Sequence, residues 1–121
     1  MLNDASGFSK IYLAVGYTDL RKGIDGLAGI VRQQFQLDPF QKNVIFLFCG
    51  KRCDRMNALC WEGDGFVVAY KRLECAGTFK WPRTSSELKE LSDEQFRMLM
   101  QGFEVFPKRP ISEICPPKEP L

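Results

Sequence analysis

Positively charged side chains concentrate in the middle of this 121-residue sequence. Between residues 42 and 83 the chain carries eight basic residues and four acidic ones, whereas residues 1–41 are balanced and residues 84–121 have an acidic excess. The eight are Lys42, Lys51, Arg52, Arg55, Lys71, Arg72, Lys80 and Arg83. Basic groups gathered on one surface bind nucleic-acid phosphates, because each neutralised phosphate releases counterions. The central segment is therefore the candidate site for binding a polyanion.

Aromatic residues accompany these charges, namely Trp61, Tyr70 and Trp81. Aromatic rings interleaved with basic residues are typical of nucleic-acid-binding surfaces. A solvated sheet end with aromatic rings buried beneath it gives the same pattern, and the modest net charge of +2 favours that interpretation. On the residues alone, both interpretations stay open.

The sequence offers little for catalysis, because it contains no histidine, the commonest general base. A two-metal nuclease needs converging carboxylates, but the spacing of the acids places them in separate turns and on a helix face. They are Asp19, Asp25, Asp54, Glu62 and Asp64. We predict that they form turns and helix caps and that the protein is not an enzyme. The least favoured alternative is a metal-dependent nuclease that uses Asp25 or Asp64.

The five cysteines lie within or beside apolar runs, at positions 49, 53, 60, 75 and 115. No pair has the two-residue spacing of zinc sites, and histidine is missing. No signal peptide or membrane-spanning run is present, so we expect a cytoplasmic protein. The cysteines are then predicted to be buried free thiols, with no metal and no cofactor.

A β-meander must position the basic residues. Apolar runs separated by short turns predict four strands, at 43–49, 55–61, 66–73 and 78–81. The first run is continuously apolar, as expected of a central strand buried on both faces.

Alternate turns of a meander lie at the same end of the sheet. Turns 50–54 and 74–77 should therefore meet, with turn 62–65 at the opposite end. This arrangement predicts a basic rim at one end, although Lys71 and Arg72 are neighbours on a strand and must point to opposite faces. At the end of a strand either cation can still reach the rim, or Glu74 and Asp54 can form ordinary surface ion pairs with them.

An N-terminal strand and a helix precede the meander. Residues 10–15 predict the strand, and Thr18 or Asp19 can cap the helix. Its predicted apolar stripe is Leu20, Ile24, Leu27, Val31 and Phe35. Gly23, Gly26 and Gly29 are interpreted as marks of close backbone packing. The charged face outside the stripe is Arg21, Lys22, Asp25 and Arg32.

A second helix follows the meander. Ser92 and Gln95 predict a capping box, Leu91 a staple against Phe96, and Gly102 the helix end. Its predicted buried stripe is Phe96, Leu99, Met100 and Phe103. The whole is a single α+β domain: a predominantly antiparallel meander of about four to five strands, covered by an N-terminal helix, plus a C-terminal helix. We place a flexible tail at 1–9, the domain at 10–106 and a proline-rich tail at 107–121.

Several motifs in order resemble the small accessory protein of the IS66 family of bacterial insertion sequences, from about residue 10 to 103. They are TDLRKGIDGL at 18–27, DPF at 38–40, DR at 54–55, WEGDGF at 61–66, YKRLE at 70–74 and FKWP at 79–82. The matching motif residues are Thr18, Asp19, Arg21, Lys22, Gly23, Asp25, Gly26, Arg55, Tyr70, Lys71, Arg72, Glu74, Trp81 and Pro82. Asn57 departs from the pattern, because a basic residue is usual there.

The resemblance implies an accessory protein for DNA transposition, acting beside a separate, larger transposase. Its partners would be DNA at the insertion-sequence ends, the transposase, or both. The residues expected to contact DNA are Arg21, Lys22, Lys51, Arg52, Arg55, Lys71, Arg72 and Arg83. The alternative is an adaptor that docks the transposase through the exposed helix face or the proline-rich tail, without DNA contact. The sequence does not indicate an oligomeric state.

Overall fold

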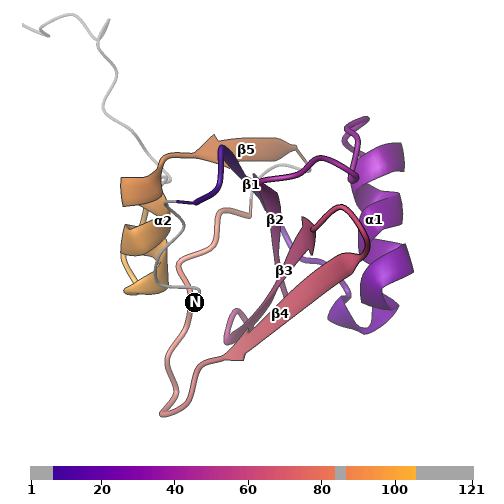
Figure 1. Ribbon diagram of the computed structural model, residues 1–121. Coiled ribbons are helices and arrows are strands. Elements are labelled where there is room, and N and C mark those ends of the chain that lie inside the picture. The colour runs from indigo at the N-terminus through magenta and orange to yellow at the C-terminus, as the bar shows by residue number, and fades with distance from the viewer. Residues whose placement is uncertain (1–6, 84–86, 106–121) are drawn as a thin grey trace, which may run out of the picture.

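The computed structural model describes residues 7–83 and 87–105, which form one five-stranded sheet and two α-helices (Figure 1). The strands are β1 (Lys10–Ala14), β2 (Val44–Cys49), β3 (Arg55–Trp61), β4 (Phe66–Arg72) and β5 (Leu88–Leu91). The helices are α1 (Gly23–Gln33), the short 3-10 helix η1 (Leu20–Lys22) and α2 (Asp93–Met100). The predicted α+β fold is confirmed.

The sheet order is β4-β3-β2-β1-β5, with β1 and β2 parallel and every other neighbouring pair antiparallel. Strand β2 is central and buried along its whole length. This confirms the prediction drawn from its continuous apolar run. The β2-β3-β4 meander is also present as predicted.

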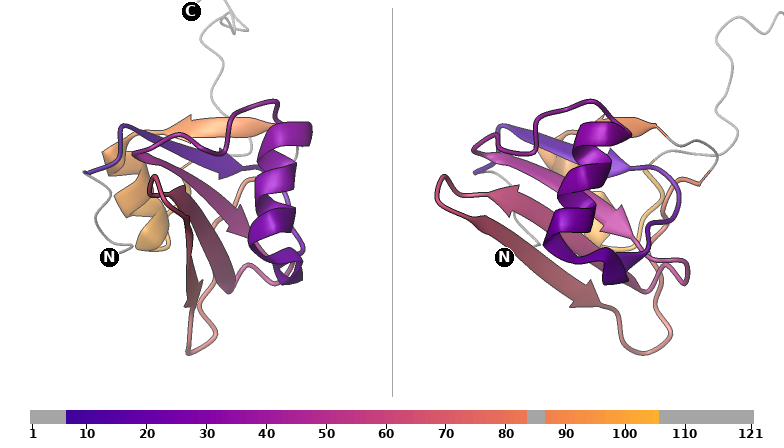
Figure 2. Two further views of the ribbon diagram at one scale, coloured as in Figure 1. Left: turned by 45° about the vertical axis from the view of Figure 1, so that its right-hand side comes forward. Right: turned by 90° about the vertical axis from the view of Figure 1, so that its right-hand side faces the viewer.

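The two helices cover opposite faces of the sheet (Figure 2). On one face, Leu27 and Val31 of α1 join a cluster with Phe46 and Phe48 of β2. On the other face, Phe96 and Leu99 of α2 join a second cluster with Leu47. The alternating side chains of β2 thus supply both cores, which is why this strand has no polar side.

The predicted strand at 78–81 is wrong. Residues 78–81 form no strand, and the chain instead crosses back toward β1, where the Trp81 Nε1 donates a 2.8 Å hydrogen bond to the Ala14 carbonyl. The fifth strand is β5, which pairs with β1 at the far edge. Short apolar runs predict burial better than they predict pairing, and both Phe79 and Trp81 are buried.

The helices differ from prediction at their ends. Ile24 is exposed, and Phe35 lies beyond the end of α1, although it packs against the same cluster. Phe103 is exposed beyond the end of α2. Within α2, the Ser92–Gln95 capping box is present, and Gly102 follows the helix with a left-handed φ of 92°.

The glycines of α1 do not mark close packing of helix on strand, so that interpretation is wrong. A Cβ at Gly29 would meet nothing within 4 Å, and one at Gly26 would lie 2.4 Å from the Lys22 Cβ. Gly23 has a φ of 71° and provides the left-handed joint between η1 and α1. Gly23 and Gly26 therefore serve the tight turn between η1 and α1, and nothing in the structure explains Gly29.

Two predictions concern segments beyond the described residues. The proline-rich tail at 107–121, which includes Cys115, and most of the N-terminal tail lie outside them. Among the described residues, no helix is long and apolar enough to span a membrane.

Candidate nucleic-acid interface

The ends of the meander lie as the sequence predicts. The Leu73 amide donates to the Asp54 carbonyl over 2.6 Å, and the Phe79 amide donates to the Cys53 carbonyl over 2.7 Å. These bonds bring the β2–β3 turn beside the segment that follows β4. The β3–β4 turn lies at the opposite end of the strands, where the Glu62 amide donates to the Gly65 carbonyl.

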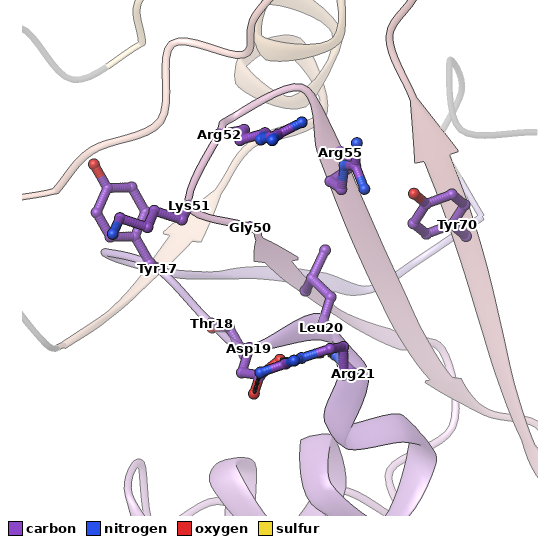
Figure 3. Close-up of a pocket in the computed structure, with 10 residues that line it drawn as sticks. All are labelled: Tyr17, Thr18, Asp19, Leu20, Arg21, Gly50, Lys51, Arg52, Arg55 and Tyr70. Atoms are coloured by element: carbon purple, nitrogen blue, oxygen red, sulfur yellow. Dashed lines mark hydrogen bonds and ion pairs between the residues drawn. The ribbon is translucent and has the colours of Figure 1, made fainter.

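A pocket of ≈ 560 Å³ opens between this β2–β3 turn and the loop leading into α1 (Figure 3). We call it the basic pocket. Its lining residues are Tyr17, Thr18, Asp19, Leu20, Arg21, Gly50, Lys51, Arg52, Arg55 and Tyr70. It brings together four basic side chains and one carboxylate from segments about 30 residues apart in the chain.

The loop at 17–22 forms one wall of the basic pocket. The Thr18 amide donates to the Cys49 carbonyl over 2.9 Å, which ties the loop to the end of β2. Asp19 then caps η1 by accepting the Arg21 amide. The same carboxylate accepts two further hydrogen bonds from the Arg21 guanidinium, at 2.9 and 3.1 Å. The Asp19 side chain therefore both caps η1 and pairs with the Arg21 guanidinium.

The pairing determines the charge state of Asp19. The side-chain hydrogen bonds from Arg21, together with its backbone amide, lower the Asp19 pKa to about 2. The carboxylate consequently stays ionised in mildly acidic solution and offsets one of the four cations in the basic pocket.

We expect the Arg21→Gln substitution to raise the Asp19 pKa toward its ordinary value of 3.8, because the guanidinium that favours the ionised form is removed. Carboxyl ¹³C NMR shifts followed from pH 6 to about 1.5 measure it. Arg97→Gln, on the exposed side of α2, is the matched control and should leave the Asp19 pKa unchanged. An unchanged value in Arg21→Gln would contradict the assigned cause.

The remaining cations of the basic pocket differ in how they are paired. Arg55 binds Asp54 at 3.1 Å, and this pairing lowers the Asp54 pKa. Lys51 and Arg52 are exposed and form no ion pair with any residue in the described part of the chain. These two side chains can therefore bind an anion without breaking an ion pair to the described residues.

Two arginines lie directly opposite each other on neighbouring strands. Arg55 of β3 pairs in register with Arg72 of β4, so both point to the face covered by α1. Like charges in this position destabilise a sheet. Each has an acidic partner next to it, and Arg72 binds Glu74 at 3.1 Å. Lys71 points to the opposite face, as predicted, so it is separated from this group.

Arg83 joins the basic pocket through Tyr17. Its guanidinium lies over the Tyr17 ring, 4.9 Å from the centroid, and also donates hydrogen bonds to the Tyr17 hydroxyl and to the Cys53 Sγ. The Pro82 carbonyl accepts a 2.8 Å hydrogen bond from the Gly16 amide. Trp81 and Pro82 therefore place Arg83 beside the loop at 17–22.

The structure thus sorts the eight basic residues expected to contact DNA. Arg21, Lys51, Arg52 and Arg55 line the basic pocket, while Arg72 and Arg83 adjoin its lining residues. Lys22 is exposed at the end of η1, and Lys71 lies on the other face. Sequence reasoning missed Tyr17 and Leu20 as lining residues. The available signal was the TDLRKG motif, which contains Leu20 and directly follows Tyr17.

Asn57, the departure from the family pattern, lies on β3 between Arg55 and Leu59. It is only 6% exposed, and its Oδ1 has no hydrogen-bond partner among the described residues. Asn57 is the in-register partner of Tyr70, and it is not among the residues that line the basic pocket.

The described acids and cysteines do not form a metal site. Asp25 is exposed on α1, Asp64 lies in the far turn, and no group of three or more metal-binding side chains is found in residues 7–83 and 87–105. Cys49 and Cys53 are buried free thiols, and burial raises the Cys49 pKa. Cys75 is exposed, contrary to the prediction that the cysteines are buried.

The chain is similar in sequence to known proteins. Residues 9–110 match the family described as IS66 Orf2 like protein. Two curated relatives come from Sinorhizobium fredii (strain NBRC 101917 / NGR234). Uncharacterized protein y4jC is 34% identical over 78% of this chain and 80% of its own length. Uncharacterized protein y4hO is 30% identical over 78% of this chain and 81% of its own length. No solved structure matches.

Proposed function

Because the chain belongs to the IS66 Orf2-like family of insertion-sequence accessory proteins, we propose that it binds DNA during transposition through the basic pocket. The convergence of Arg21, Lys51, Arg52 and Arg55 is the observation that supports this. Their guanidinium and ammonium groups would contact phosphates of the DNA backbone, which fixes position on the duplex but carries no sequence information.

The state of these cations favours phosphate as the ligand. Lys51 and Arg52 form no described ion pair, while Arg21 and Arg55 keep exposed or half-exposed carboxylate partners. Exposed ion pairs contribute only about 0 to 1 kcal/mol. A phosphate can therefore compete for Arg21 and Arg55 at little cost while it binds Lys51 and Arg52 directly.

A salt titration with a fluorescein-labelled duplex of about 20 base pairs tests the proposal. If the four cations each neutralise one phosphate, the logarithm of the affinity should fall against the logarithm of the salt concentration with a slope of about −3.6. Fluorescence anisotropy measures the dissociation constant at each concentration. Absence of binding at low salt would overturn the proposal.

A transposase adaptor is the second candidate function. Ile24, on the helix face expected to be apolar and buried, is 39% exposed beside the charged residues Arg21 and Asp25. An exposed branched side chain among charges is compatible with docking to a protein. Co-purification with the transposase after nuclease treatment, abolished by Ile24→Asp and unaffected by charge reversal at Arg52 and Arg72, would favour this function.

A further inference from the structure

Two tyrosines stand on opposite sides of the basic pocket (Figure 3). Tyr17 is 47% exposed and Tyr70 is 55% exposed, whereas most aromatic rings of this sheet are buried or half-buried. Leu20 lies between them and packs against Gly50, where a Cβ would come within 3.4 Å of its Cδ1. The basic pocket therefore has the apolar Leu20 side chain at its base, a tyrosine ring on each of two sides and basic side chains around them.

A phosphate alone does not account for this lining. Phosphate oxygens accept hydrogen bonds from guanidinium, ammonium and hydroxyl groups, but gain nothing from Leu20 or from an aromatic face. A nucleobase offers the complementary surface, because every base has a flat face that stacks on aromatic side chains. The pocket volume of ≈ 560 Å³ lies within the range of small-molecule sites.

The two rings are not equivalent. The Tyr17 ring already carries the Arg83 guanidinium 4.9 Å from its centroid. The Tyr70 ring makes no aromatic or cation–π contact with any residue in the described ranges. Tyr70 also lies close enough to Arg55 to raise its pKa, after the larger effect of Asp54. A ring that is more than half exposed thus stands next to Arg55, one of the cations proposed to bind phosphate.

We infer that the basic pocket takes an unpaired base, with Tyr70 as the stacking platform and the surrounding cations on the flanking phosphates. This rests on the proposed DNA binding and specifies its substrate class: DNA with an extruded, bulged or single-stranded nucleotide. Bases within an intact duplex stack on one another, so their faces are not open to Tyr70.

Two otherwise identical duplexes of about 15 base pairs test the inference, each with one central bulged nucleotide. In one the bulge carries thymine, and in the other it is an abasic nucleotide with the same phosphates. We expect the protein to bind the thymine bulge about 5- to 150-fold more tightly, which is the range found when one base loses its aromatic partner. Anisotropy at one fixed salt concentration measures both dissociation constants.

Variants at position 70 assign the preference to the ring. Tyr70→Phe should retain it, because the stacking face remains, and Tyr70→Leu should lose it and bind the thymine and abasic duplexes with equal affinity. Far-UV circular dichroism checks that the variants fold. The comparison of the thymine and abasic duplexes is made with the unchanged protein, so it does not depend on the folding of any variant.

The outcomes separate the two proposals. Equal affinity for both bulged duplexes would overturn base recognition and leave phosphate binding in place. A preference for thymine that Tyr70→Leu retains would overturn the assignment of Tyr70 as the platform. Failure to bind either bulged duplex or a fully paired control at low salt would overturn DNA binding itself.

Discussion

Replacing Arg52 and Arg55 together by glutamate is expected to weaken binding to duplex DNA by at least about 100-fold at about 50 mM salt. Each phosphate contact contributes roughly tenfold at this concentration through counterion release, and two contacts are lost. The introduced carboxylates also repel the phosphates of the DNA backbone. The slope of the logarithm of the affinity against the logarithm of the salt concentration should become less negative, by the amount expected for the loss of about two phosphate contacts. Anisotropy titrations measure this slope directly.

The control must change the net charge equally without touching the basic pocket. Arg97 is exposed on α2, on the opposite side of the sheet, and Lys42 is exposed at the other end of the strands. Arg97→Glu with Lys42→Glu should therefore weaken binding far less. Equal losses in the two double variants would show that overall charge, rather than the basic pocket, governs binding.

Trp81→Ala is expected to lower the free energy of unfolding by about 3 to 5 kcal/mol. The ring is buried in the cluster on the α2 side of the sheet, lies edge-on to Phe79, and donates a hydrogen bond to the Ala14 carbonyl. The substitution leaves a cavity and removes the hydrogen bond to the Ala14 carbonyl at the end of β1. Urea denaturation, monitored by the far-UV circular dichroism of the backbone rather than by tryptophan fluorescence, measures the change.

Two variants separate the causes of this loss. Trp81→Phe keeps most of the apolar volume but removes the donor, so it should cost less than Trp81→Ala, about 1 to 3 kcal/mol. Lys80→Ala, at the exposed neighbouring position, should change stability by less than about 0.5 kcal/mol. A Trp81→Ala protein as stable as the Lys80→Ala protein would contradict the role of Trp81 as an anchor.

The anchor also matters for the basic pocket. Trp81 and Pro82 attach the chain to β1 and to Gly16, next to the loop that carries Tyr17 and Asp19. This contact explains, in physical terms, why two motifs more than 50 residues apart in the chain belong to one arrangement.

The sequence alone was sufficient for features with short-range causes. The apolar run of β2 predicted a strand buried on both faces, and the Ser92–Gln95 capping box predicted the start of α2. Hairpin spacing predicted the common end of turns 50–54 and 74–77, and strand alternation predicted that Lys71 and Arg72 diverge. All of these depend on residues that are near one another in the chain, through side-chain alternation in strands, turn spacing or a local capping bond.

Only the tertiary structure decided how distant segments meet. The strand expected at 78–81 is replaced by a crossing segment that buries Phe79 and Trp81, because Trp81 bonds to Ala14 instead of extending the meander. Strand β5, rather than residues 78–81, is the additional strand of the sheet, and it pairs with β1 at the sheet edge. The basic pocket likewise joins the loop before α1 to the β2–β3 turn, and Tyr17 and Leu20 become lining residues only there. Charge counts locate cations along the chain, but hydrogen bonds between remote segments determine which of them share a surface.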